Sequence, residues 1–361
     1  MSNTAAIATR TRRARLFAGT AALAAVAAAA LSATAAEAAE PADGAACEIT
    51  ELPMPRDTYF SIVTGMSEDG SAIAYRAYPV GISGDERYPM VYLDGEATEV
   101  VMPGVEQLLN DVNSSGTAVG RSLVDNVDKP YVWQDGVLTE LDGAGSANGI
   151  NESGDIVGSV GGDEWWLPAL WPAGKTEPVE LPVPEGTLWG SADEIRDDGT
   201  VIGTLGIQFD EDGIDVSTPY VWHPDGTGEA LPAPEGFGKE DVLYTLDLAG
   251  DWATGYVLTP EYEGGVRWNL AEGTVEVLDM VYAPGVNAEG TAAGEGYPSA
   301  VYQPAGGEVV ELPGLTAPED NWFGDMATEI DPTGKLLAGQ VYAGDDEYDW
   351  HILKAVTWTC E

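Results

Sequence analysis

The feature that most constrains this chain is a short unit that recurs along most of its length. Its cleanest copy is Ile150–Gly158, in which an apolar residue precedes a polar turn and a short run that ends in glycine. Glycine takes positive φ at little steric cost, so the pattern is typical of two strands joined by a tight turn. Related turns occur at 66–70, 112–116, 195–199, 248–255, 286–290 and 330–334. We therefore expect seven strand-turn-strand repeats.

The spacing of these turns sets the size of each repeat. The 264 residues from Gly70 to Gly334 contain six intervals, so the mean period is 44 residues, the length expected for a propeller blade of four strands. Each hairpin is followed by a strand that ends in an aromatic residue and by a short strand of alternating apolar and polar residues. The sequence predicts an all-β fold, a seven-bladed β-propeller of four-stranded blades, as a single domain at 47–361.

One aromatic residue ends the third strand of every repeat. Large rings at such a repeated position are expected to fill the interfaces between neighbouring blades. We assign them to the core rather than to a ligand site. They are Tyr92, Trp133, Trp171, Trp222, Trp268, Tyr302 and Trp358.

The last repeat lacks its fourth strand, and a run near the N-terminus matches what is missing. The chain stops at 358–361, where a turn into that strand would begin, whereas residues 47–53 resemble the fourth strands of the other repeats. Cys47 begins this run and Cys360 ends the last one, and two cysteines in an exported chain favour a disulfide. We predict that the N-terminal strand completes the last blade and that a Cys47–Cys360 disulfide closes the ring.

The pattern Ile-Asn-x-x-Gly-x-x-x-Gly, followed by an aromatic-ended strand and a Leu-ended strand, resembles the bacterial extracellular HAF-repeat proteins. The resemblance spans 47–361 and includes a Trp-x-x-Gly step at Trp133 and Gly136, while the repeat around Leu248 lacks the Asn and its spacing. The resemblance implies an exported repeat protein of propeller type. It implies no assigned chemistry, so no catalytic residue is carried over from it.

The N-terminal segment 1–38 has the composition of a secretory signal. Four arginines between 10 and 15 precede an alanine-rich run that extends to about Ala36. The pair Arg12 and Arg13 resembles a twin-arginine signal, so that route and the general secretory route both stay open. Residues 39–46 are small or polar and are expected to form a flexible linker.

The net charge of the chain limits the kinds of partner that it can bind. Cleavage after Ala38 would leave 11 Lys plus Arg against 60 Asp plus Glu, a formal charge of −49. A surface of this kind repels nucleic acid and keeps a protein soluble. We expect a secreted, extracellular monomer with no membrane span after signal cleavage.

Acidic residues recur just before the apolar residue that ends the first strand of a repeat. The first strand of a propeller blade is innermost, so these carboxylates are expected near one mouth of the central channel. We expect either a cation site, with calcium as its ion, or solvated acids that this composition would produce by itself. No other cofactor is expected. The residues are Asp111, Glu194, Asp247 and Glu329.

The opposite face is expected to carry the loops that vary most in length, as binding loops do. Aromatic residues beside acids gather in these loops, which suits stacking on sugars as well as contact with a protein. The candidate ligand-binding residues, which we call the loop-face aromatics, are Trp165, Trp166, Trp189, Tyr262, Trp322, Tyr348 and Trp350.

Two functions remain open from the sequence. The favoured one is a binding or scaffold module whose ligand is an extracellular glycan or protein. The alternative is a propeller hydrolase or lyase that acts on an extracellular polysaccharide through carboxylates. Histidine is limited to His223 and His351, and no motif activates a nucleophile. No catalytic residue is therefore predicted.

Overall fold

The computed structural model describes residues 47–54, 58–79, 86–161, 165–209, 215–238, 241–260, 262–317, 321, 324–345 and 351–361. The chain divides into two compact units, Met1–Ala42 and Asp43–Glu361, and every described residue belongs to the second. The expected signal 1–38 and linker 39–46 lie outside the described residues. In the described part of the chain, no helix has the length and apolar character needed to cross a membrane.

The described part of the chain is all-β, as the repeat predicts, and most of its strands form four-stranded antiparallel sheets. The first two sheets are β6 (Val105–Val112), β7 (Ala118–Val124), β8 (Val127–Gln134) and β9 (Val137–Glu140), then β10 (Ala144–Ile150), β11 (Ile156–Gly161), β12 (Trp166–Trp171) and β13 (Val179–Glu180). The next is β14 (Trp189–Ile195), β15 (Val201–Phe209), β16 (Asp215–Trp222) and β17 (Gly228–Ala230). Two more follow: β18 (Val242–Ala249), β19 (Trp252–Leu258), β20 (Glu263–Asn269) and β21 (Thr274–Val277), then β22 (Tyr282–Val286), β23 (Ala292–Glu295), β24 (Ala300–Gln303) and β25 (Val310–Glu311).

The remaining strands form one larger sheet that joins the two ends of this unit. Its N-terminal strands are β1 (Cys47–Glu51), β2 (Thr58–Met66), β3 (Ala72–Pro79), β4 (Tyr88–Leu93) and β5 (Glu96–Glu99). Its C-terminal strands are β26 (Met326–Ile330), β27 (Leu336–Asp345) and β28 (His351–Cys360). The two groups meet where β2 lies parallel to β28, with Phe60 opposite Leu353. The amide of Ala355 also donates to Ser61 Oγ at 2.9 Å.

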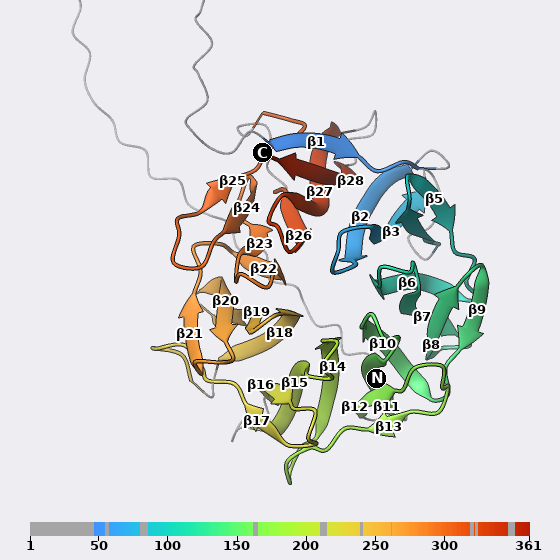
Figure 1. Cartoon of the computed structure of the whole chain (residues 1–361), viewed down its shortest axis with the longest axis vertical. Helices are drawn as coiled ribbons and strands as arrows, with labels where there is room; N and C mark the ends of the chain where they lie inside the picture. Colours follow the sequence, from blue (N-terminus) through green and yellow to red (C-terminus); the bar gives the residue numbers. More distant parts are fainter. Residues whose placement is uncertain are drawn as a thin grey trace, which may run out of the picture. The chain divides into compact units, whose positions relative to one another are not determined.

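Within this unit the sheets follow one another around a common centre (Figure 1). The strands nearest the centre are β2, β6, β10, β14, β18, β22 and β26. Each contacts the next one in this order, and β26 contacts β2 again. The hydrophobic core lies between neighbouring sheets, because the buried clusters combine residues of adjacent groups. The sheets therefore pack face against face and leave their inner edges around the centre.

The asparagine of the repeat links one hairpin turn to the next. Asn113 Oδ1 accepts the amides of Ser115 and Thr117 inside its own turn, at 3.2 and 3.1 Å. Its Nδ2 donates to the carbonyl of Asn151 in the following sheet at 3.1 Å, and Asn151 Nδ2 donates onward to Arg196 O at 3.2 Å. The asparagine side chain thus stabilises its own turn and also links it to the next sheet. Gly154 then closes the turn with a φ of +86°, a conformation that favours glycine.

The aromatic residues at the ends of the third strands lie between sheets, as the sequence predicts. Trp171, Trp268 and Trp358 have no exposed surface, and Trp222 is 2% exposed. The indole N–H of Trp222 donates to the carbonyl of Pro182, just after the last strand of the preceding sheet, at 2.7 Å. Trp268 and Trp358 make the same bond to Pro232 and Pro313, each at 2.8 Å. Each ring therefore packs in the core and also ties two sheets together.

The N-terminal strand β1 lies beside the C-terminal strand β28. β1 pairs antiparallel with β28 in a register that places Cys47 opposite Cys360 and Glu51 opposite Val356. The predicted disulfide is present between Cys47 and Cys360, whose Cα atoms are 4.1 Å apart. It joins residues 313 positions apart in the sequence and connects β28 to β1, as a turn connects the third and fourth strands of each four-stranded sheet.

Candidate functional site

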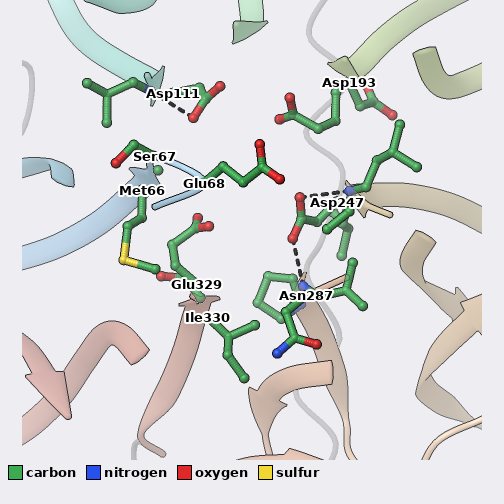
Figure 2. Close-up of a pocket in the computed structure, with 18 of the residues that line it drawn as sticks. Met66, Ser67, Glu68, Asp111, Asp193, Asp247, Asn287, Glu329 and Ile330 are labelled. Atoms are coloured by element: carbon green, nitrogen blue, oxygen red, sulfur yellow. Dashed lines mark hydrogen bonds between the residues drawn. The ribbon is translucent and has the colours of Figure 1, made fainter. Parts of the chain in front are cut away.

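A cavity of about 350 Å³ lies where the first strands of the sheets reach the hairpin turns. Residues from β2, β6, β10, β14, β18, β22 and β26 line it, together with residues of the following turns. Figure 2 shows carboxylate side chains from several of these strands around one common space. We call it the axial cavity. Its carboxylates are Glu68, Asp111, Glu152, Asp193, Glu194, Asp197, Asp247 and Glu329.

A repeated bulge turns two successive residues of a strand toward this cavity. Regular pairing of β14 with β15 shifts between Ala192 and Glu194, which leaves Asp193 as an extra residue. The same shift occurs in β6 between Leu109 and Asp111, where Asn110 is the extra residue. As a result, Asp193 and Glu194 line the cavity together, and Asn110 and Asp111 do the same. Simple alternation along a strand would have placed only one of each pair there.

Glycine and carboxylate residues occupy equivalent positions in neighbouring first strands because the strands approach closely. A Cβ added to Gly65 would lie 2.7 Å from the Cα of Asp111, and one added to Gly285 would lie 3.2 Å from the Cα of Glu329. A side chain at these glycines would collide with the next backbone. The glycines therefore make room for the acidic residue that follows them around the cavity.

Two of the carboxylates are held by backbone amides. Asp111 accepts the amide of Val112 at 2.7 Å and that of Ile150, in the next sheet, at 2.8 Å. Asp247 repeats the arrangement with Leu248 at 2.7 Å and Val286 at 2.6 Å. Burial raises the pKa of Asp111 to about 7 and that of Asp247 to about 6, even though the amide bonds act in the opposite direction. Both residues therefore bridge adjacent sheets. Both also bind a proton more readily than an exposed aspartate does.

The two glutamates at this level have fewer partners. Glu194 Oε1 accepts the amide of Ile195 at 2.8 Å. Glu329 points from the end of β26 into the cavity (Figure 2) and has no hydrogen-bond partner among the described residues. Burial raises the pKa of both glutamates well above the usual range, and the charges of Asp111 and Asp247 add to the effect. Each side chain keeps part of its surface exposed, so this desolvation is partial.

Asp193 lies in a cluster of hydroxyl groups. Its Oδ2 accepts a bond from Thr245 Oγ1 at 2.7 Å, and Thr245 Oγ1 lies 3.2 Å from Thr204 Oγ1. Burial raises the pKa of Asp193 to about 7, against the lowering effect of these hydroxyls. Tyr282 also lines the cavity, and burial raises its pKa to about 12, with the charge of Asp193 contributing.

The turns add further negative charge at the rim of the cavity. Burial raises the pKa of Glu68, and the charges of Asp197 and Glu152 raise it further. Arg196 is the cationic side chain among the described lining residues, but its guanidinium is already paired with Asp198 at 2.5 Å. The cavity thus presents an excess of carboxylates that the lining residues do not neutralise.

The structure gathers the four acidic residues singled out from the sequence in one place, since Asp111, Glu194, Asp247 and Glu329 all line the axial cavity. They do not converge on a point, because among the described residues no group of three or more His, Cys, Asp or Glu side chains is placed to hold a metal ion. Sequence reasoning missed four more carboxylates of the cavity. They are Glu68, Glu152, Asp193 and Asp197.

The loop-face aromatics have different surroundings. Trp165 is 46% exposed and Tyr262 is 42% exposed, whereas Trp166 is partly buried in β12. The ring of Trp189 covers Gly206, because a Cβ at that glycine would meet the indole nitrogen at 2.0 Å. Trp322, Tyr348 and Trp350 lie outside the described residues. Exposure therefore distinguishes Trp165 and Tyr262 as the accessible members of the described set.

Comparison with known proteins defines the fold type. No protein-family model matches the chain, and no curated protein matches its sequence. The chain is similar to the structure of an oligogalacturonate lyase from Vibrio parahaemolyticus, with a TM-score of 0.54 and 10% identity over 86% of this chain and 93% of that one. It is also similar to an oligogalacturonate lyase in complex with manganese, with a TM-score of 0.52 and 13% identity over 88% and 94%. At these identities the likeness shows the fold alone: an all-β, propeller-type fold of repeated four-stranded sheets.

Proposed function

We propose that residues 47–361 form a seven-bladed β-propeller in which β1 completes the last blade. The support is the pairing order, since the larger sheet separates at the contact of β2 with β28 into β2–β5 and a group of β26, β27, β28 and β1. These two groups and the five four-stranded sheets give seven blades of four strands each. The contacts between successive first strands support closure. The disulfide would then be the clasp of the ring.

We further propose that this propeller is a secreted binding module whose ligand site is the axial cavity and whose ligand carries positive charge. The observation that carries this proposal is the one-sided charge of the described lining: carboxylates from several blades face a shared space, and the nearby Arg196 is already paired. Like charges held together in a protein cavity attract cations and raise their local concentration. Calcium belongs to this class of ligand, as do organic cations.

The loop-face aromatics give the module a second proposed surface. Trp165 and Tyr262 are exposed, and exposed aromatic rings suit contact with a glycan or with a protein partner. This surface would let a secreted monomer attach to an extracellular glycan or protein while the axial cavity takes a small cation. Nucleic acid is not proposed as a partner, because the chain carries a net charge of −46.

The enzyme alternative receives less support from the geometry. Two of the similar structures are oligogalacturonate lyases, and one of them holds manganese, but a likeness at this identity does not carry activity. The described residues that line the axial cavity include neither histidine nor lysine, which are common proton-transfer groups. A polysaccharide lyase or hydrolase would have to work with the carboxylates alone.

Thermal melts in different salts test the proposed function. The protein is melted at about pH 8 in sodium, calcium and alkylammonium chlorides of equal ionic strength, because a ligand that binds only the folded state raises the midpoint. We expect at least one of the two test cations to raise it above the sodium value in the wild type and in Glu308→Gln, an exposed-site control. The rise should be smaller in Glu329→Gln. Midpoints that follow ionic strength alone would contradict a cation site, and turnover of an acidic polysaccharide would favour the enzyme.

A further inference from the structure

The axial cavity has the dimensions of a site for a small organic molecule. A calcium ion needs about six to eight oxygens at roughly 2.3–2.6 Å, and among the described residues no group of three acidic, His or Cys side chains is so placed. The volume of about 350 Å³ falls in the range of about 300–1,000 Å³ that is typical of pockets for organic ligands. The carboxylates therefore surround a space larger than one ion fills.

Glu329 supplies an independent indication of a ligand. Its carboxylate points into the cavity (Figure 2), keeps part of its surface exposed and has no hydrogen-bond partner among the described residues. The protein supplies no donor to this partly buried carboxylate, so its partners are solvent or a ligand. Asp111 and Asp247, at equivalent positions, each accept two backbone amides. Among the four acidic residues at this level, Glu329 thus has both oxygens available for a donor from a ligand, whereas Glu194 Oε1 already accepts the amide of Ile195.

Apolar and aromatic groups lie beside these charges. Leu246 and Pro284 are the extra residues of two of the bulges and line the cavity at the positions where other strands carry Asn110 and Asp193. The ring of Tyr282 lines it as well and lies 5.3 Å from the ring of Tyr256. An aromatic ring next to carboxylates favours a cation through its negative face. One side of the cavity therefore suits an apolar stem, and the rest suits a positive head group.

We propose that the axial cavity binds a primary alkylammonium group, in which the charged amine meets Glu329 and its apolar stem lies against Leu246, Pro284 and Tyr282. The inference rests on the proposed cation site and names the class of its ligand. Two sources present this chemistry, a free aliphatic amine and the lysine side chain of a peptide. Three N–H donors on an ammonium match carboxylates that lie apart around the cavity, whereas a divalent ion requires them to converge.

Isothermal titration with defined probes tests this inference. The probes are pentylamine and cadaverine as free amines, acetyl-lysine methylamide as the peptide form, pentanol as the neutral analogue of the stem, and calcium. We expect at least one amine probe to bind more tightly than calcium at about pH 8, and pentanol not to bind. Glu329→Gln should weaken amine binding about tenfold, as expected for the loss of one charge-assisted bond. Tyr282→Leu should weaken it several-fold, and Glu308→Gln should leave it unchanged.

The possible outcomes test the ligand class and the proposed cation site separately. Binding of calcium alone, reduced in Glu329→Gln, would overturn the alkylammonium inference and leave the cation site in place. If neither calcium nor any amine binds, both proposals fail. Tighter binding of acetyl-lysine methylamide than of the free amines would identify a peptide as the source, and the reverse order would identify a free amine. Amine binding that is equal in Glu329→Gln and the wild type would overturn the inference, with thermal melts showing that the variant is folded.

Discussion

The interfaces between the sheets and the wall of the axial cavity are built from the same repeat but follow opposite rules. At the interfaces, the polar groups of the repeated Trp and Asn are paired: the indole N–H of Trp222 donates to Pro182 O, and Asn113 bonds both its own turn and Asn151. In the cavity wall, carboxylates such as Glu194 and Glu329 face others of the same charge. The interfaces thus stabilise the fold, whereas the cavity wall costs stability at neutral pH.

This difference between the interfaces and the cavity wall indicates which region of the molecule carries its function. A repeat needs its Asn and its Trp to hold neighbouring sheets, but nothing in the packing requires a glutamate at position 329, since that side chain makes no hydrogen bond within the described structure. Regions that lower stability without a structural return are commonly functional. Substitutions should therefore lower stability at the interfaces and raise it in the cavity.

The largest effect is expected from opening the proposed ring. Cys360→Ser removes the disulfide to Cys47, which the chain-entropy model values at up to about 5 kcal/mol for so long a loop. The N-terminal strand β1 could then separate from β28, so unfolding should accelerate. Denaturant-jump kinetics would measure this, with Gln134→Ala as a control at an exposed strand position. Equal unfolding rates for the wild type and Cys360→Ser would show that the disulfide does not keep the proposed ring closed.

A slightly smaller loss of stability is expected when an aromatic side chain between two sheets is removed. Trp268→Ala removes a fully buried side chain and its bond to Pro232, and a large-to-small change of this kind costs about 3–5 kcal/mol. Trp165→Ala, at a ring that is 46% exposed, should change the free energy of unfolding far less. Urea denaturation of both variants tests the contrast. If retention on a glycan array falls in Trp165→Ala, the loop face is also a binding surface.

The interface part of the structure could be predicted from the sequence because its signals are periodic. The turn glycines, the aromatic strand ends and the match of 47–53 to the other fourth strands led to the four-strand units, the inter-sheet rings and the disulfide. The role of Asn113 and Asn151 between sheets was not foreseen. Their place in a turn is a local property, whereas the partner carbonyl is fixed only when the next sheet is packed.

The cavity was predictable only in part. Asp111, Glu194, Asp247 and Glu329 share a repeat position, and this symmetry placed them at one end of the first strands. Asp193 was missed because alternation along a strand assigns it to the opposite face, and the bulge after Ala192 reverses that assignment. The consecutive polar pairs Asn110-Asp111 and Asp193-Glu194 were a signal that could have indicated it. The rim carboxylates depend on how the turns are oriented, which the repeat pattern does not specify.

A moderate effect is expected at the paired asparagines. Asn151→Ala removes bonds to the amide of Asp155 and the carbonyl of Arg196, and the loss of a buried polar partner costs about 1–3 kcal/mol. Urea denaturation should show this loss, while Gln134→Ala, at an exposed strand position, should be nearly neutral. A neutral Asn151→Ala would mean that the repeat asparagine shapes the turn only and does not hold the sheets.

The smallest effect, and the one of opposite sign, is expected in the cavity. The pKa values of Asp111 and Asp193 are raised to about 7 and that of Asp247 to about 6, from a usual 3.8. A carboxyl whose pKa is higher in the folded state favours folding at low pH and loses this contribution as pH rises through the folded pKa. Stability should therefore increase as pH falls from about 8 to about 5. Asp198, whose pKa is lowered to about 2, opposes this trend only below that window.

Glu329→Gln separates this effect from general surface charge. Removing one uncompensated charge should raise the melting midpoint at about pH 8 by roughly 2–4 °C, which corresponds to about 1 kcal/mol for a domain of a few hundred residues. The gain should shrink as pH falls from about 8 to about 5, because the raised pKa of Glu329 lets the wild-type carboxyl take up a proton more readily than an exposed glutamate does. Glu308→Gln, at an exposed site, should show neither change. A loss of stability in Glu329→Gln at both pH values would contradict the contrast between the two regions.

The most direct test of the central claim, that the axial cavity holds uncompensated carboxylates available to an ammonium ligand, is a carbon-detected NMR titration of the Asp and Glu carboxyl groups with and without cadaverine. We predict that the carboxyls of Asp111, Asp193 and Asp247 titrate with pKa values near those given by their burial, about 6–7. Bound cadaverine should lower these pKa values and that of Glu329, because a nearby positive charge favours the ionised form. Carboxyls that all titrate at ordinary values, or cavity pKa values that cadaverine leaves unchanged, would contradict the account.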